Sequence, residues 1–187
     1  MLDWAIEAAA TVANGIVLAV PSERVHEPEP SVDVVVAGGE TRSDSVRRAL
    51  AALPADVAVV VVHDAARPLA TPALFSAVVD AVSVPGVDGA VPGVPLTDTI
   101  KRVQDGRVVD TLDRAELVAV QTPQAFRAVT LRRAHARNLD ATDDAALVEA
   151  IGGRVVVVAG EADNDKLTTA ADLVLARERA ARLSPSR

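Results

Sequence analysis

Charged side chains directly follow an apolar run in the first half of the sequence. Asp64 and Arg67 lie in the segment His63-Asp64-Ala65-Ala66-Arg67-Pro68, immediately after the Val-rich residues 56–62. Ligands of open α/β sheets bind at the carboxyl ends of strands. A carboxylate there can hold Mg²⁺ together with substrate phosphates, and a guanidinium can bind phosphate oxygens. The same spacing is compatible with an aspartate that caps the next turn and an arginine on the surface.

Two further segments combine a turn with groups that suit an anion. Gly38-Gly39 follows the apolar residues 32–37 and comes before Glu40 and Ser45. Glycines let a ligand approach the backbone, and the helix start behind them favours anions. Lys166 lies at the entrance to the last helix, where a cation is unfavourable unless a phosphate binds nearby. A plain strand-to-helix turn and a solvated lysine explain the same two patterns.

The pair Asp105-Gly106, flanked by alternating apolar and polar residues, predicts a β-hairpin. We expect residues 98–114 to form an arm that projects from the sheet. The arm concentrates polar and basic side chains on an acidic protein, namely Thr99, Lys101, Arg102, Arg107 and Arg114. These charges suit a phosphate, but they also keep an exposed hairpin soluble and discourage pairing at its edges.

The elements that must position these residues alternate between Val-rich strands and helices, which is typical of an α/β sheet. With only 2% aromatic residues, the core must be built from Val, Ala and Leu. We expect one domain over residues 1–187, with Val-rich strands of the kind that parallel sheets bury on both faces. The expected strands are 15–20, 32–37, 56–62, 89–94 and 154–159, and the expected helices are 2–13, 43–53, 71–82, 128–137, 143–150 and 170–183. Ser43 or Asp44 is the expected N-cap of the second helix.

Composition excludes several classes of function. The net charge of −7 argues against nucleic acid or an anionic membrane as a general partner. The sequence contains no cysteine, which removes disulfides and thiolate metal sites and fits a cytoplasmic protein. No apolar run is long enough to cross a bilayer, and the first residues do not resemble a secretion signal. Ser43 and Ser45 have no histidine nearby to activate them, which disfavours a serine hydrolase.

Taken in order, the motifs resemble those of one family, the 2-C-methyl-D-erythritol 4-phosphate cytidylyltransferases of the non-mevalonate isoprenoid pathway. The resemblance covers nearly the whole chain, and its specificity lies in the order of six modest strings. These are Ala37-Gly38-Gly39 through Arg42 to Ser45-Val46, Val62 to Pro68, Pro95-Leu96-Thr97-Asp98-Thr99-Ile100-Lys101, Gln121-Thr122-Pro123-Gln124-Ala125-Phe126, Ala141-Thr142-Asp143-Asp144-Ala145, and Asn164 through Lys166 to Thr168.

The resemblance implies a Rossmann-like nucleotidyltransferase sheet with a protruding β-arm, assembled as a homodimer. It implies transfer of CMP from CTP to the erythritol phosphate with release of pyrophosphate, and Mg²⁺ as the cofactor. By similarity, the nucleotide lies along Gly38, Gly39, Glu40, Ser45, Asp64 and Ala65, with the metal on Asp64. The polyol phosphate is bound by Arg67, Thr99, Arg114, Thr142 and Lys166. Arg114 and Lys166 are the catalytic pair, and the arm residues Thr99 and Arg114 enter the partner subunit's site.

Such chemistry needs no protein nucleophile, because a phosphate oxygen of the acceptor attacks the α-phosphorus of CTP directly. Two anions must be brought together, so catalysis consists of positioning and charge neutralisation. Asp64 with its metal, Lys166 and Arg114 are the groups expected to supply both.

The sequence departs from the family pattern at its start. Family members open with a strand and a Gly-rich loop that carries an Arg and a Lys and wraps the triphosphate, whereas the residues from Met1 onward align with the helix that follows that loop. We therefore expect an N-terminally truncated domain. Three alternatives follow: an enzyme whose natural chain is longer, an inactive or weakly nucleotide-binding relative, and a dimerisation module. A ribitol-5-phosphate cytidylyltransferase is a further alternative for the substrate.

Overall fold

The computed structural model describes residues 2–183, which fold into helices on both sides of strands. The helices are α1 (Leu2–Ala10), α2 (Arg42–Ala52), α3 (Pro72–Ser83), α4 (Ala128–His135), α5 (Asp144–Glu149) and α6 (Ala170–Leu183), with short 3₁₀ turns η1 (Ser22–Arg24) and η2 (Arg114–Glu116). The strands are β1 (Val17–Val20), β2 (Val34–Ala37), β3 (Val59–Val62), β4 (Gly89–Pro95), β5 (Ile100–Gln104), β6 (Arg107–Leu112), β7 (Val118–Val120), β8 (Gln124–Arg127) and β9 (Val155–Ala159).

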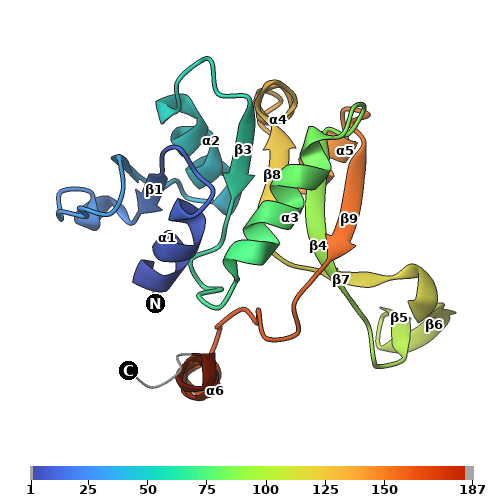
Figure 1. Ribbon diagram of the computed structural model, residues 1–187. Coiled ribbons are helices and arrows are strands. Elements are labelled where there is room, and N and C mark those ends of the chain that lie inside the picture. The colour runs from blue at the N-terminus through green and yellow to red at the C-terminus, as the bar shows by residue number, and fades with distance from the viewer. Residues whose placement is uncertain (1, 184–187) are drawn as a thin grey trace.

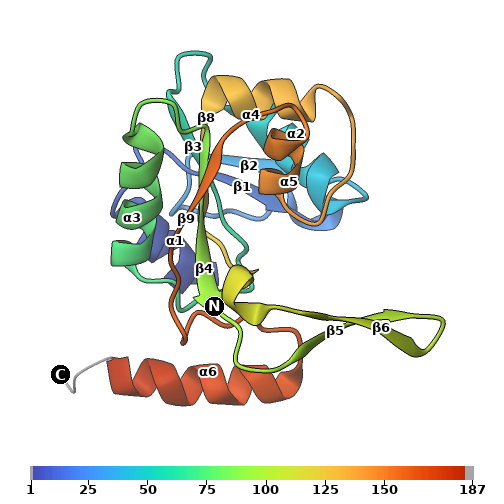
Figure 2. The same cartoon turned by 90° about the vertical axis from the view of Figure 1, so that its right-hand side faces the viewer.

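The main sheet has five strands and is mixed rather than parallel. Strand β8 lies between β3 and β4 and runs antiparallel to both, β7 is antiparallel to β4, and β9 is parallel to β4. Helices α1 and α3 cover one face, and α2, α4 and α5 lie on the other (Figures 1 and 2). The expected α/β class is confirmed. Strand β8 was not predicted, because four residues of mixed polarity after a proline carry no alternating pattern.

The two largest apolar clusters hold the sheet between its helices. On one side Val60, Phe126, Leu131 and Val148 are buried together, and on the other α3 contributes Val78 and Val82 to a second cluster. Gly89 lets β4 pass the ring of Phe126, since a Cβ atom at this glycine would lie 2.6 Å from the ring. The expected core of small aliphatic residues thus also includes Phe126, and the second phenylalanine, Phe75, is buried in a smaller cluster with Ala8 and Leu74.

The arm forms as the sequence predicts. Strands β5 and β6 pair in an antiparallel hairpin, with Asp105 and Gly106 at φ 50° and 75° in the turn. These positive φ values are those that an Asp-Gly hairpin turn requires. The hairpin projects from the body of the molecule, and α6 lies apart from the sheet along the same end (Figure 2). The closing helix has the predicted bounds.

An apolar groove of about 1090 Å³ separates β1 from β3. Its lining includes Ile6 of α1, Val17 of β1, Ala49 of α2 and Val61 of β3. Within residues 2–183, β1 pairs only with β2, and β3 pairs only with β8. The two-stranded and five-stranded sheets are therefore not joined to each other by backbone hydrogen bonds.

Within the same residues, none of the helices has the length and apolar character that a bilayer crossing requires.

Candidate functional site

Asp64 lies where the sequence places it, directly after β3, and two cations from distant parts of the chain bind its carboxylate. Lys166 Nζ donates to Asp64 Oδ2 at 2.8 Å, and Arg42 Nε lies 3.4 Å from Oδ1. Burial acts to raise the pKa of the Asp64 carboxyl, but the hydrogen bond from Lys166 and the charge of Arg42 outweigh it and hold the pKa below its ordinary value. Asp64 is therefore an anion at neutral pH, and the fold brings Lys166 to it from the far end of the chain.

Arg42 also connects Asp64 to a buried carboxylate on another element. Its Nη1 atom lies 2.8 Å from Oδ2 of Asp144, whose side chain is 0% exposed at the start of α5. The other oxygen of Asp144 lies 2.8 Å from His135 Nε2 at the end of α4. Burial acts to lower the pKa of Arg42, yet the charge of Asp144 and its hydrogen bond outweigh it and raise that pKa.

A chain of hydrogen bonds fixes the backbone on either side of Asp64. The Asp64 N–H donates to Thr122 Oγ1 at 3.0 Å, and that oxygen lies 3.0 Å from His63 Nδ1. His63 Nε2 lies 3.1 Å from the carbonyl oxygen of Arg67. A neutral imidazole protonated on Nε2 satisfies every partner, because the Thr122 hydroxyl then donates to Nδ1 and Nε2 donates to the carbonyl.

The burial of His63 has a consequence for stability at acid pH. Burial lowers the pKa of His63 from 6.5 to about 4, so folding keeps the ring neutral while the unfolded chain takes up a proton below pH 6.5. The free energy of unfolding should then fall between pH 6.5 and 4, by up to about 3 kcal/mol from this group.

Urea midpoints measured across this pH range check the expectation. His63→Gln should show a weaker pH dependence than the unaltered chain, whereas His26→Gln, at an exposed histidine, should not differ from it. An equal slope for His63→Gln would contradict the buried neutral ring.

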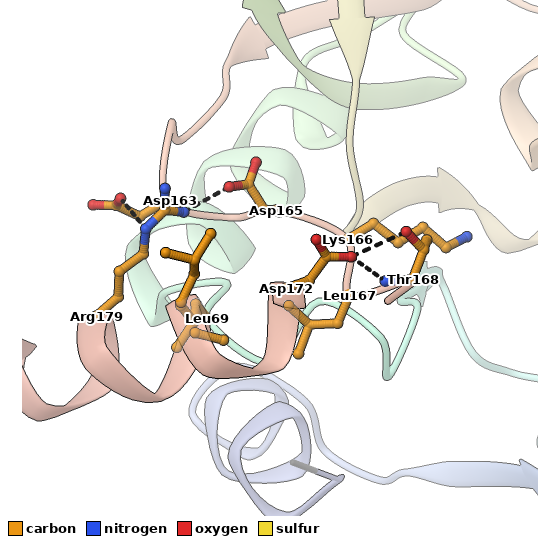
Figure 3. A pocket seen from close by; sticks show the side chains of 10 residues that line it. Leu69, Asp163, Asp165, Lys166, Leu167, Thr168, Asp172 and Arg179 are labelled. Atoms are coloured by element: carbon orange, nitrogen blue, oxygen red, sulfur yellow. Dashed lines mark hydrogen bonds and ion pairs between the residues drawn. The ribbon is translucent and has the colours of Figure 1, made fainter. Parts of the chain in front are cut away.

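Hydrogen bonds hold the loop that carries Lys166 against the Asp64 segment. Arg67 Nη1 donates to the carbonyl of Asn164 at 2.7 Å, and the N–H of Leu167 donates to the carbonyl of Ala66 at 2.8 Å. Asn164 is fully buried and donates to the carbonyl of Thr122. On its outer side the loop borders a small pocket of about 240 Å³, where Arg179 of α6 pairs with Asp163 and Asp165 (Figure 3). Arg67 is thus bound to the loop that carries Lys166.

The glycine turn before α2 is held by its own contacts. The N–H of Gly39 donates to Ser45 Oγ at 3.0 Å, and a Cβ atom at Gly39 would lie 2.1 Å from the Cβ of Asp44. Thr41 caps α2 by accepting from the N–H of Asp44, so the predicted cap at Ser43 or Asp44 is wrong. The glycine is required by the close packing of the turn on the helix, while Gly38, Glu40 and Ala65 lie along the same edge, with Glu40 and Ala65 exposed.

Thr142 and the arm residues occupy different surroundings. Thr142 is exposed and precedes Asp143, which caps α5 by accepting from the N–H of Ala146. Arg114 donates to the carbonyl of Thr97 at the base of the arm, and among the described residues neither it nor Thr99 forms a hydrogen bond or ion pair with the Asp64 cluster. Thr142 therefore lies next to Asp144 in one subunit, whereas Thr99 and Arg114 do not join the cluster within a single chain.

Residues 1–180 match the family model of IspD, 2-C-methyl-D-erythritol 4-phosphate cytidylyltransferase. The chain belongs to this family. A bifunctional IspD/IspF enzyme of Nitratidesulfovibrio vulgaris is 46% identical over 93% of the chain and 49% of its own length. The 2-C-methyl-D-erythritol 4-phosphate cytidylyltransferase of Frankia casuarinae is 53% identical over 81% of the chain and 58% of its own. The chain thus spans about half the length of the curated relatives it matches.

Solved structures of the IspD family share the fold. The 2-C-methyl-D-erythritol 4-phosphate cytidylyltransferase of Thermus thermophilus superposes with a TM-score of 0.85 at 36% identity, covering 96% of this chain and 88% of the other. The bifunctional IspDF of Campylobacter jejuni superposes with a TM-score of 0.78 at 27% identity, covering 92% of this chain and 45% of the other. The nucleotidyltransferase fold expected from the sequence is confirmed.

The donors at the IspD-family site fit a metal that is shared with a substrate. Among residues 2–183, no group of three or more His, Asp or Glu side chains could hold a metal ion. Asp64 offers a carboxylate directly after β3, and Mg²⁺ is commonly bound by one or two carboxylates together with substrate phosphates. Such an ion would have to compete with Lys166 for Asp64 Oδ2.

Sequence reasoning did not single out Arg42, Thr122, His135 or Asp144 as parts of the site. Arg42 and Asp144 are separated by 102 residues, and no local pattern predicts that they pair. The available signal was indirect, since Arg42, Thr122 and Asp144 all lie in the six strings shared with the family.

Proposed function

We propose that this chain transfers CMP from CTP to 2-C-methyl-D-erythritol 4-phosphate, giving 4-diphosphocytidyl-2-C-methyl-D-erythritol and pyrophosphate for isoprenoid precursor synthesis. The observation that carries the proposal is the Asp64 carboxylate held between Lys166 and Arg42 at the carboxyl end of β3. The family model and the Frankia relative both name the erythritol phosphate, which favours it over ribitol 5-phosphate. The proposed compartment is the cytoplasm, with neither nucleic acid nor membrane as a partner.

The reaction forms a bond between a phosphate oxygen of the acceptor and the α-phosphorus of CTP. It breaks the bond from that phosphorus to the oxygen bridging to the β-phosphate, and pyrophosphate leaves with the electron pair. Asp64 would hold Mg²⁺, and the bound ion would supply positive charge to the triphosphate. Lys166 releases Asp64 to neutralise and orient the acceptor phosphate, since a flexible ammonium on an exposed loop can reach either group.

The other residues line the two substrates. Gly38, Gly39, Glu40, Ser45 and Ala65 border the nucleotide along the turn before α2 and the segment after β3. Arg67 and Thr142 bind the polyol phosphate beside Lys166. Thr99 and Arg114 act in the site of a second subunit, since the arm formed by β5 and β6 projects away from the body of its own chain (Figure 2).

Pyrophosphate release by the 187-residue chain from CTP, erythritol phosphate and Mg²⁺ tests the function and the dimer together. Asp64→Asn and Arg114→Ala should each lose most of the activity. If Arg114 acts across the dimer, a 1:1 mixture of the two variants regains it, because a hybrid dimer has one site with both native residues. If subunits exchange at random between dimers, about a quarter of all active sites regain both native residues.

Each other outcome excludes part of the proposal. Activity lost in both variants and absent from the mixture would place Arg114 in its own subunit's site. Release of pyrophosphate with ribitol 5-phosphate but not with the erythritol phosphate would mean that the proposed acceptor is wrong. No release and no CTP binding would leave the chain as a dimerisation module, and CTP binding without release would make it an inactive relative.

A further inference from the structure

A row of contacts between acidic and basic side chains crosses the candidate site and joins five separate elements. It runs from Lys166 through Asp64, Arg42 and Asp144 to His135, with closest contacts of 2.8, 3.4, 2.8 and 2.8 Å. Its members come from the loop before α6, the end of β3, the start of α2, the start of α5 and the end of α4. Among the described residues, Arg42 is the member that links the Asp64 side of the row to the Asp144 side.

The geometry of Arg42 uses two different edges of its guanidinium. Nε faces Asp64, whose side chain is 17% exposed, and Nη1 faces Asp144, whose side chain is 0% exposed. A guanidinium holds its N–H donors in a rigid plane. Once one carboxylate binds it, the direction of the donors that face the other carboxylate is fixed. A lysine ammonium is a single point charge and cannot reproduce this fork.

Asp144, the second carboxylate that binds Arg42, makes the position of Arg42 itself well defined. Asp144 is held by both Arg42 and His135, and the loop before it docks on the start of α2 through the hydrogen bond of Thr41 to Asp140 at 2.9 Å. The Asp64 carboxylate has contacts only with Arg42 and with Lys166 among the described residues. If Lys166 leaves for a substrate, Arg42 is the one described group that still orients Asp64.

We propose that Arg42 is a positioning residue that fixes the Asp64 carboxylate relative to the loop carrying Thr142. The proposal rests on the proposed transfer reaction, in which Asp64 must face the nucleotide while Lys166 and Thr142 face the acceptor. Arg42 thereby ties the two halves of the site together without touching either reactant. A purely structural alternative is that Arg42 only neutralises the buried Asp144, since an unpaired buried carboxylate is strongly destabilising.

Three variants separate positioning from charge neutralisation. Arg42→Gln should lower both the melting temperature and kcat. Arg42→Lys keeps the charge but not the fork, and kcat should stay at least about tenfold below that of the unaltered chain, since small misplacements of reacting groups cost that much or more. In Arg42→Gln/Asp144→Asn the buried charge is gone, so the melting temperature should recover while kcat stays low.

The matched control is Arg132→Gln, which removes a partly buried arginine that donates to the carbonyls of Leu53 and Pro54. This variant should lower the melting temperature without lowering kcat at 25 °C. Full kcat in Arg42→Lys, or recovery of kcat together with melting temperature in the double variant, would overturn the positioning role.

Hydrogen exchange gives a reading that does not depend on turnover. Amide exchange in residues 62–68 should accelerate in Arg42→Gln and also in the double variant, and it should be unchanged in Arg132→Gln. Protection restored in the double variant would mean that Arg42 acts only through Asp144. If the unaltered chain released no pyrophosphate, the transfer reaction itself would fail, and exchange would still decide whether Arg42 orders the Asp64 segment.

Discussion

Replacing Lys166 with alanine is expected to lower the rate of pyrophosphate release by about a hundredfold or more, with little change in stability. The Lys166 side chain is 46% exposed, and exposed ion pairs typically contribute less than about 1 kcal/mol to folding. A cation that stabilises charge developing in the transition state is worth about 10² to 10³ in rate. The effect on kcat should therefore exceed the effect on the melting temperature by a wide margin.

Steady-state rates and thermal unfolding of the same preparations provide the measurement. Arg133→Ala serves as the control, because it removes an exposed cation from α4 and should leave both quantities unchanged. Lys166→Arg should recover part of the rate, since it restores the charge with a different shape. A Lys166→Ala variant with unaltered turnover would remove this residue from the proposed reaction.

Replacing Phe126 with alanine should produce the largest loss of stability, about 3 to 5 kcal/mol. Phe126 is 0% exposed, pairs with Val60 across β8 and β3, and lies at the centre of the larger apolar cluster. Removing its ring opens a cavity that the surrounding strands cannot close. Urea unfolding should show this loss, while Val129→Ala, at a side chain 66% exposed, should change stability by less than about 0.5 kcal/mol.

Gly89 provides an internal check on this packing. Gly89→Ala should destabilise the protein, because the new methyl group would lie 2.6 Å from the Phe126 ring. Combining it with Phe126→Leu should cost less than the sum of the two single changes, since the smaller side chain makes room for the methyl group. Additive effects would show that the two positions do not share this contact.

The string Gln121 to Phe126 illustrates what sequence reasoning could and could not supply. As a motif it pointed to the family, and the family is confirmed. Its side chains are buried: Gln124 bonds to the cap of α5, Thr122 holds Asp64, and Phe126 fills the core. The side chains of this string therefore hold the site residues in place from the interior of the protein. Spacing along the sequence does not predict such a role.

The site itself was predictable only in part. Asp64 and Lys166 could be placed because each follows a strand or precedes a helix at a sheet edge, and the fold brings the two into contact. Arg42 was missed because its partners, Asp64 and Asp144, are far away in the sequence and are brought to it by folding. The Asp-Gly turn of the arm was predictable for the opposite reason, since neighbouring residues determine it.

Among the described residues, the groove between β1 and β3 separates the two-stranded sheet of residues 2–52 from the five-stranded sheet. Because no strand pairing crosses this groove among the described residues, α1, β1, β2 and α2 are attached to the larger sheet by helix packing, by the ion pairs of Arg42 and by hydrogen bonds such as that of Thr41 to Asp140. We expect a layer attached in this way to open at a lower free energy than the sheet beside it. An opening of this layer would withdraw Arg42 from both carboxylates, so the proposed transfer reaction and the local opening of residues 2–52 would be coupled through one side chain.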